Sequence, residues 1–260
     1  MFLSEPAETS FDLRFWLFGT HVRVHPWFWL LSALLGWDLV GSGGRTGLLY
    51  LGVWILCVFV SILVHEFGHI AMGRLFGSHG HIVLYSFGGL AVGSNALNRG
   101  WQRFLVSFAG PLAGFIFYGL VVIASIFLLP LVPRDGRNVA AAAVGMLEWI
   151  NLGWGLINLL PVWPLDGGQM AREVFVAAAP RNGDVITLAV SACAAGLVAL
   201  QCAFPQLLAR HVPLLADWIE PDVYMAILFG LLCVQSITAL QAANARQRRY
   251  NEEEEFPWER

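Results

Sequence analysis

Residues 48–76 read LLYLGVWILCVFVSILVHEFGHIAMGRLF, an apolar run long enough to cross a lipid bilayer as a helix. Within this run, residues 65–69 form the motif H-E-x-x-H. On a helix, His65 and His69 lie one turn apart on the same face, so both imidazoles can bind one metal ion. Glu66 lies beside them and can accept the proton of a metal-bound water. The run therefore predicts a zinc site on a membrane-spanning helix, which indicates hydrolysis within the bilayer.

The composition is that of an integral membrane protein. The chain is 57% hydrophobic and 13% charged, against about 25% charged for a soluble domain. Its net charge of −3 and the absence of a basic patch argue against nucleic acid as a partner. The 4 cysteines stand singly in apolar runs and form no C-x-x-C pair. Neither a zinc ribbon nor a disulfide framework is indicated.

The hydropathy pattern predicts an α-helical membrane protein with about six transmembrane helices, as a single domain over residues 1–245. The expected spans are residues 27–40, 48–73, 104–132, 139–160, 184–208 and 222–241. Residues 79–93, after the second span, are too rich in glycine for a spanning helix and predict a short membrane-associated β or loop segment. Residues 246–260 predict a charged cytoplasmic tail.

Arginine residues indicate the orientation in the membrane. With both termini in the cytoplasm, eleven of the 15 arginines lie on the cytoplasmic side, and only Arg45, Arg134, Arg137 and Arg210 lie on the other. Leu48 to Val64 spans roughly 25 Å of helix at about 1.5 Å per residue. We therefore expect the H-E-x-x-H motif near the cytoplasmic edge of the hydrocarbon, in what we take to be a bacterial inner membrane.

A catalytic zinc site needs a third protein ligand, for which Glu148 and Asp166 are the acidic candidates. Asp166 follows a segment that Pro161 and Pro164 must interrupt as a helix. Non-helical backbone at membrane depth is tolerated where it lines a cavity or is packed in protein. The second and fourth spans both run inward, which brings Asp166 to the level of the histidines and leaves Glu148 at mid-membrane. Asp166 is the predicted ligand.

The two motifs together resemble the site-2 protease family of intramembrane zinc metalloproteases. Further similarity lies in residues 22–26 (VRVHP), in Phe87-Gly88-Gly89 and in residues 107–111 (SFAGP). The resemblance implies that one zinc ion per chain is bound by His65, His69 and Asp166, and that Glu66 activates the water. It also implies that Asn158 binds the substrate or the transition state, and that the segment from Phe87, Gly88 and Gly89 to Val92 pairs with an unwound substrate strand.

The sequence departs from many relatives in two respects. Where they have asparagine shortly after the A-G-P element, this chain has Gly114, which with Gly110 forms G-x-x-x-G and predicts close helix packing. The segments after the second and sixth spans are too short for the PDZ or cystathionine-β-synthase-type domains of other members. We therefore expect a compact form in which spans, loops or a regulatory membrane partner control access.

The function predicted is cleavage of peptide bonds within or near transmembrane segments of a membrane protein substrate. Two other classes stay open: a membrane metal transporter that uses the same ligands, and a catalytically inactive scaffold that binds membrane proteins. Asn151 also has two interpretations, as an amide donor in the site or as an interhelical hydrogen-bonding residue.

Overall fold

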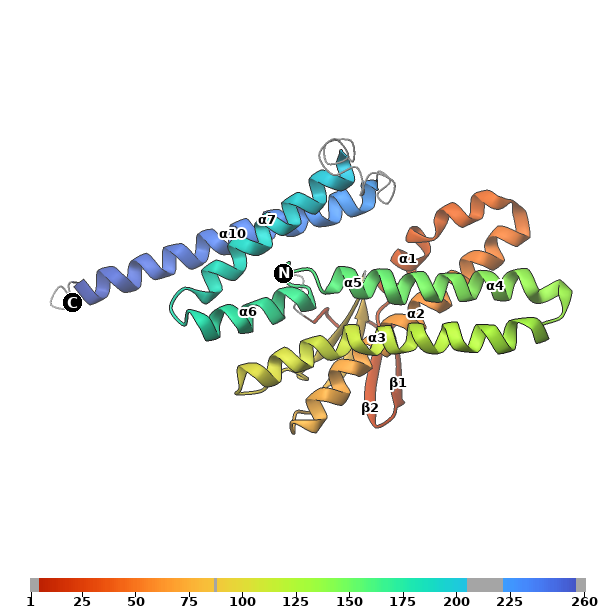
Figure 1. The fold of residues 1–260 in the computed structure, drawn as a ribbon, viewed down its shortest axis with the longest axis horizontal. Helices are drawn as coiled ribbons and strands as arrows, with labels where there is room; N and C mark the ends of the chain where they lie inside the picture. Colours follow the sequence, from red (N-terminus) through yellow and green to blue (C-terminus); the bar gives the residue numbers. More distant parts are fainter. Residues whose placement is uncertain (1–4, 87, 205–221, 256–260) are drawn as a thin grey trace. The chain divides into compact units, whose positions relative to one another are not determined.

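The computed structural model describes residues 5–86, 88–204 and 222–255 (Figure 1). The chain forms two compact units, residues 1–159 and residues 160–260, and each is considered by itself. The first unit contains a four-stranded sheet and the helices that carry the H-E-x-x-H motif. The described part of the second unit contains three helices, of which the first begins at Asp166.

The first unit begins with the strands β1 (Leu13–Leu17) and β2 (Thr20–Val24), which pair as an antiparallel hairpin. Two further strands, β3 (His81–Tyr85) and β4 (Gly88–Val92), form a second antiparallel hairpin. β2 pairs parallel to β3, so the sheet order is β1-β2-β3-β4 and β4 forms one edge. The non-helical segment predicted after the second span is confirmed, as the β3–β4 hairpin.

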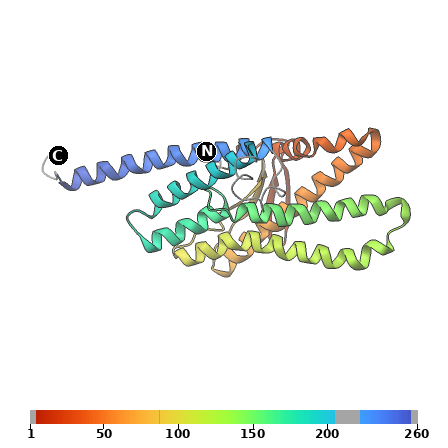
Figure 2. The same ribbon diagram turned by 45° about the horizontal axis from the view of Figure 1, so that its top comes forward.

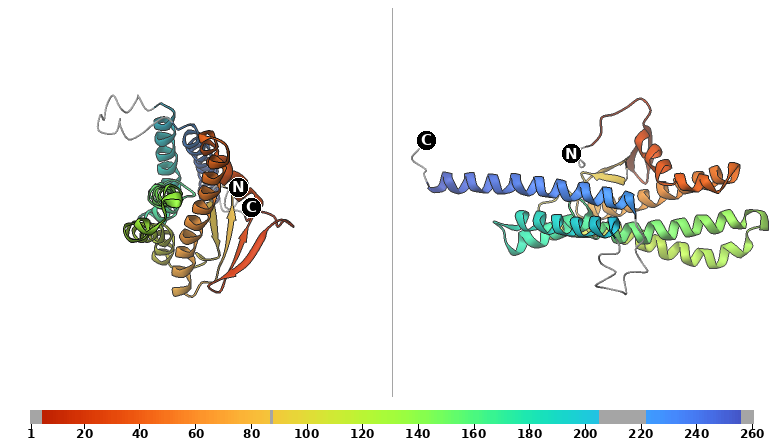
Figure 3. Two further views of the ribbon diagram at one scale, coloured as in Figure 1. Left: turned by 90° about the vertical axis from the view of Figure 1, so that its right-hand side faces the viewer. Right: turned by 90° about the horizontal axis from the view of Figure 1, so that it is seen from above.

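The longest helix of the first unit is α2 (Gly44–Leu75), whose 32 residues span about 48 Å. α3 (Gly100–Leu128) and α4 (Arg134–Trp149) pack beside it, and a short 3-10 turn, η2 (Leu129–Leu131), follows α3. The chain then passes through a π-helical segment, η3 (Ile150–Trp154), into α5 (Gly155–Asn158). Figure 3 shows α2 between the sheet on one side and the α3–α4 pair on the other.

The first apolar segment is shorter than the expected span 27–40. It forms α1 (Pro26–Leu35), a helix of 10 residues, followed by the 3-10 helix η1 (Trp37–Ser42). A ten-residue helix extends about 15 Å, which is half of the hydrocarbon core. The helix ends at Gly36, where the ring of Trp54 leaves no space for a side chain.

The helices described in the second unit are α6 (Asp166–Ala178), α7 (Gly183–Ala203) and α10 (Val223–Glu255). α7 and α10 lie side by side in Figures 1 and 2, and the Ser191 and Ser236 hydroxyls hydrogen-bond between them. The expected fifth span, 184–208, matches α7 as far as residue 203, and residues 205–208 lie outside the described residues. The expected sixth span matches the first part of α10, and the helical backbone continues into the charged tail.

The α-helical membrane fold is confirmed, since the described residues contain 5 helices long and apolar enough to cross a membrane, together with the shorter α1. The last turn of α2 contacts the sheet. Arg74 there donates hydrogen bonds to the carbonyl oxygens of Phe18 and Gly19 at the β1–β2 turn. This places the sheet alongside the half of α2 that carries the histidines.

Candidate metal centre

His65, Glu66 and His69 form a buried cluster on α2. Their exposed fractions are 7%, 5% and 7%, and one ligand atom from each residue lies within 4.8 Å of the others. The Nε2 atoms of the two histidines are 3.2 Å apart. Two imidazoles bound to one tetrahedral zinc ion at about 2.0–2.1 Å would have these atoms roughly 3.3 Å apart. The pair is therefore spaced to bind one metal ion.

The orientation of His69 is fixed by a contact with α3. Its Nδ1 donates a hydrogen bond of 2.7 Å to the carbonyl oxygen of Val106. Because that N–H is used by the carbonyl, the neutral imidazole carries a lone pair on Nε2, the atom that faces His65. A hydrogen bond of this kind to the outer nitrogen is what orients metal-binding histidines in other proteins.

Glycines bring α3 close to the motif. A side chain at Gly110 would overlap the imidazole rings of both histidines, and one at Gly68 would overlap the backbone of Ala109. The predicted close packing at Gly110 is therefore observed. As a result, the backbone of α3 forms one wall of the metal centre. Gly114, one turn further along α3, lies beside Asn151.

The β4 strand forms another wall. A Cβ at Gly89 would lie 2.6 Å from the Glu66 carboxyl carbon and from its Oε1, so only glycine allows this approach. A Cβ at Gly88, by contrast, would have no neighbour within 4 Å. The prediction for Phe87 lies outside the described residues. β4, part of the segment that the sequence resemblance assigns to substrate binding, thus runs directly past the Glu66 carboxylate.

The other predicted site residues lie elsewhere along the chain. Asn158 is buried in the first unit, as the last residue of α5. Asp166 is buried in the second unit, as the first residue of α6. Glu148 is half-buried on α4 and is not part of the His65–Glu66–His69 cluster. The role of Asp166 as the third ligand stays a prediction.

The predicted break before Asp166 is present, since no helix covers residues 159–165. In the second unit the backbone N–H of Trp163 donates a hydrogen bond of 2.7 Å to the Ser191 hydroxyl oxygen, which supplies a partner where the helix has ended. Gly168 lies against the backbone of Val162 so closely that a side chain would clash. Gly168, the second residue after Asp166, thus permits this tight backbone approach.

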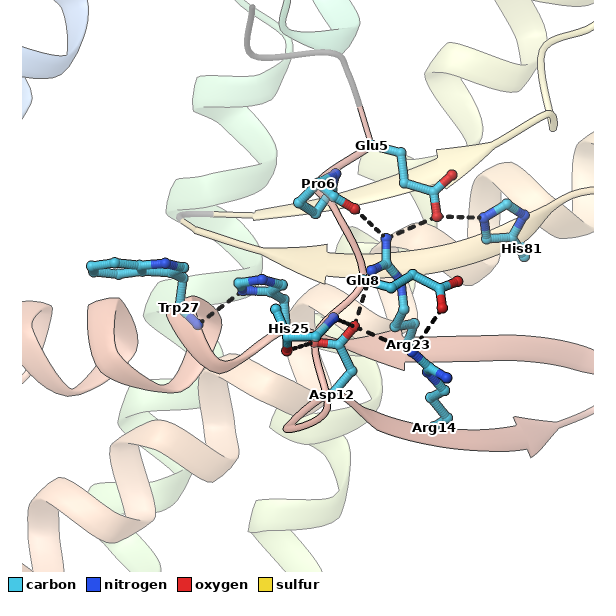
Figure 4. Close-up of polar contacts among 10 residues, drawn as sticks. Glu5, Pro6, Glu8, Asp12, Arg14, Arg23, His25, Trp27 and His81 are labelled. Carbon is cyan, nitrogen blue, oxygen red and sulfur yellow. Dashed lines mark hydrogen bonds and ion pairs between the residues drawn. The ribbon is translucent and has the colours of Figure 1, made fainter.

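Sequence reasoning missed a polar cluster at the start of the chain, shown in Figure 4. Arg23 of β2 is only 2% exposed and donates hydrogen bonds to Glu5, to Asp12 and to the carbonyl oxygen of Pro6. Glu5 also accepts a hydrogen bond of 3.3 Å from His81 of β3. These hydrogen bonds hold residues 5–12 against β2 and β3 of the sheet. The one sequence signal was an arginine between valines in an apolar strand.

Asp12 is the most perturbed acid of this cluster. Burial of the carboxyl opposes its ionisation, but hydrogen bonds from the Thr9 hydroxyl and backbone N–H, together with the Arg23 guanidinium, outweigh burial and lower the Asp12 pKa to about 2. Asp12 is therefore ionised at neutral pH. The ion pair with Arg23 holds a charge that would otherwise be buried without a partner.

Comparison with known proteins bears on the fold and on part of the sequence. Residues 136–200 match the model of peptidase family M50. The fold resembles that of the site-2 protease from Methanocaldococcus jannaschii, with a TM-score of 0.54 and 19% identity over 88% of this chain and 95% of that one. This chain has the fold of a site-2 protease. The resemblance expected from the two motifs is confirmed, and the M50 match includes Asn158 and Asp166.

Similar curated proteins carry metalloprotease names. A candidate zinc metalloprotease of Synechocystis is 36% identical over 168 residues, which is 61% of this chain and 42% of that protein. A candidate zinc metalloprotease of Mycobacterium tuberculosis, Rip3, is 29% identical over 69% of this chain and 47% of its own length. Stage IV sporulation protein FB of Bacillus subtilis is 28% identical over 59% and 47%. The chain matches less than half of the length of each of these three proteins.

Proposed function

We propose that this protein is an intramembrane zinc endopeptidase that hydrolyses peptide bonds within or next to transmembrane segments of membrane proteins. The observation that carries the proposal is the buried His65–Glu66–His69 cluster on a helix long and apolar enough to span a membrane. Three ionisable side chains in such a helix are costly unless they serve a site. Relatives named as zinc metalloproteases support zinc as the metal.

His65, His69 and Asp166 are the residues that we assign to the zinc ion. Two neutral imidazoles and one carboxylate leave one position open, as in other catalytic zinc sites. When bound, zinc would polarise the scissile carbonyl and lower the pKa of a bound water toward about 7. The Val106 carbonyl supports this assignment, because its hydrogen bond to Nδ1 holds the Nε2 atom of His69 toward His65.

Glu66 is the proton carrier in this proposal. Its carboxylate accepts a proton from the attacking water and delivers it to the amine nitrogen as the C–N bond breaks. It belongs to the same cluster as the two histidines, and no side chain at Gly89 stands between it and the sheet edge. One water is consumed per bond, its oxygen entering the new carboxylate.

The substrate must be extended where it is cut, because an amide in a helix is hydrogen-bonded and shielded. We assign the edge of β4 (Gly88–Val92), which has no strand partner among the described residues, as the surface that binds this extended segment by strand addition. The contact of Gly89 with Glu66 supports this, since a strand paired to β4 would pass the carboxylate. Asn158, with an amide group that can donate and accept, is assigned to the substrate or the transition state.

The arginine distribution supports an active site that faces the cytoplasm from a bacterial inner membrane. Water and the released cytoplasmic product would then exchange on that side. A membrane-spanning protein is the substrate class, and a regulatory membrane partner would control its access.

The test is cleavage of a single-span model substrate by the purified protein in liposomes, with zinc content measured on the same sample. Glu66→Gln should lower the cleavage rate by about 10²–10⁴-fold while zinc is retained. If Glu66→Gln cleaves at the wild-type rate with zinc bound, the mechanism is wrong. Zinc flux into the liposomes without cleavage would instead indicate a transporter, and substrate binding without either activity would indicate a scaffold.

A further inference from the structure

A small cavity borders His65, on the side of α2 that faces α3 and the π-helical segment. Its lining includes Ser61 and His65 of α2, Gly114 of α3, and Ile150, Asn151 and Trp154. The cavity offers about 10 Å³ to the centre of a water molecule, which is space for a single one. All of these residues belong to the first unit.

The polar groups around the cavity are arranged to bind water. The amide nitrogen of Asn151 donates both of its hydrogens, one to the Ser61 hydroxyl oxygen at 2.8 Å and one to the Leu147 carbonyl oxygen at 2.8 Å. The Asn151 amide oxygen is therefore available as an acceptor. Ser61, whose oxygen already accepts from Asn151, has its hydroxyl hydrogen to donate. A water between them would have a donor and an acceptor, as buried waters require.

Two backbone features create this space. The π-helical turn of η3 carries Asn151, whose side chain is 4% exposed and directed at α2. Gly114 has no side chain to fill the gap: a Cβ there would lie 3.6 Å from the Asn151 carbonyl oxygen and 3.8 Å from its amide oxygen. These are ordinary contact distances. An alanine would therefore fit without distorting the helices, and its methyl group would occupy the place of the water.

We propose that Ser61, Asn151 and the space at Gly114 bind one water molecule beside His65, and that this water replaces the one consumed in each cleavage. The second half of this statement rests on the proposed hydrolytic function, and the first half does not. Each hydrolysis removes one water from a site surrounded by apolar helices. A water held next to a predicted metal ligand can refill the site without crossing hydrocarbon.

Radiolytic labelling of the purified full chain in detergent tests the water site without any measurement of activity. Radicals formed from a bound water oxidise the side chains next to it. Ile150, which lines the cavity, and Ile62, which does not, are each 5% exposed, so Ile62 is the internal reference. We expect Ile150 to be oxidised several times faster than Ile62 in the wild type. Equal rates would overturn the proposal.

Two variants locate the water. Gly114→Ala should reduce Ile150 oxidation to the rate of Ile62 by filling the space, and Ser61→Ala should reduce it by removing the donor. Gly119→Ala, also on α3, is the matched control, since a Cβ there meets nothing within 4 Å. Unchanged Ile150 oxidation in Gly114→Ala would overturn the assignment.

Turnover tests the link to hydrolysis. With zinc content equal to that of the wild type, Gly114→Ala should lower kcat about fivefold, as for the loss of one hydrogen-bonded water, and leave KM unchanged. Gly119→Ala should have wild-type kcat. Labelling that is lost in Gly114→Ala while kcat stays at the wild-type value would overturn the replacement role. A wild-type protein that cleaves nothing would refute the proposed function, whereas the labelling result would stand by itself.

Discussion

The Nδ1 atom of His69 donates a hydrogen bond to the carbonyl oxygen of Val106, 37 positions away in the chain. This bond joins the helix of the H-E-x-x-H motif to α3 and fixes which imidazole nitrogen faces His65. The metal centre is therefore formed by two helices rather than by α2 alone. Its geometry depends on how closely α3 can approach.

Gly110 controls that approach, so Gly110→Ala should weaken metal binding. The new methyl group would overlap both imidazole rings and push α3 away, which would stretch the bond between His69 and Val106. Loss of such an orienting bond typically lowers metal affinity by about 10–100-fold. Competition with a zinc chelator measures the change. Gly119→Ala on the same helix should keep wild-type affinity, and equal affinities in the two variants would contradict this role.

Asp166 and Glu148 can be separated as the third ligand. Asp166→Ala should lose zinc, because two imidazoles without a carboxylate bind it much more weakly. Glu148→Gln should retain zinc, since Glu148 lies outside the cluster formed by the histidines. Zinc content per chain, measured after dialysis, compares the two. The assignment fails if Asp166→Ala keeps zinc and Glu148→Gln does not.

Gly89 sets the distance between β4 and Glu66. In Gly89→Ala the Cβ would be 2.6 Å from the Glu66 carboxyl carbon, so the carboxylate or the strand must move. We expect kcat to fall by about 10²-fold, as for a catalytic group displaced by 1 Å, with zinc still bound. Gly52→Ala on α2, where a Cβ meets nothing within 4 Å, serves as the control. Wild-type turnover by Gly89→Ala would show that this contact is not needed.

The N-terminal cluster should detach in acid. The pKa of Asp12 is lowered from 3.8 to about 2 in the folded protein, so its stabilising effect is complete above about pH 4 and is lost as the pH falls through 2. Protection factors of residues 9–16, which compare the measured amide exchange rate with the intrinsic rate at the same pH, should fall across this window in the wild type. In Asp12→Asn the protection factors should be low already at pH 6, with little further change.

Glu8→Gln is the matched control for that experiment. Glu8 pairs with Arg14 at the surface, with 70% of its side chain exposed, and such pairs contribute little to stability. Its exchange profile should follow the wild type. An Asp12→Asn profile that still changes between pH 4 and pH 2 as the wild type does would assign the acid sensitivity to another group.

Much of this protein could be read from the chain alone, because the relevant interactions are local. A helix places residues four positions apart on one face, so the spacing of His65 and His69 already implied a shared ligand. Apolar runs of sufficient length must be helical in a bilayer, since their backbone groups can be satisfied in no other way. Pro161 and Pro164 likewise had to end a helix before Asp166.

The length of the first helix could not be predicted from local sequence patterns. Residues 27–40 are apolar enough to suggest a crossing, but the α-helix ends at Leu35, and the ring of Trp54 packs against the next residue, Gly36. The two interpretations of Asn151 were also undecided by sequence. In the structure both amide hydrogens go to Ser61 and Leu147, so it makes an interhelical hydrogen bond.

The sequence by itself determined the class of protein, the helical pair of histidines, the adjacent carboxylate and the broken helix before Asp166. The tertiary structure decided which groups surround them: the Val106 carbonyl on His69, the backbone of Gly110 against both rings, and Gly89 against Glu66. The physical reason is distance along the chain. Helix periodicity and proline geometry act within a few residues, whereas these contacts depend on how α2, α3 and β4 pack together.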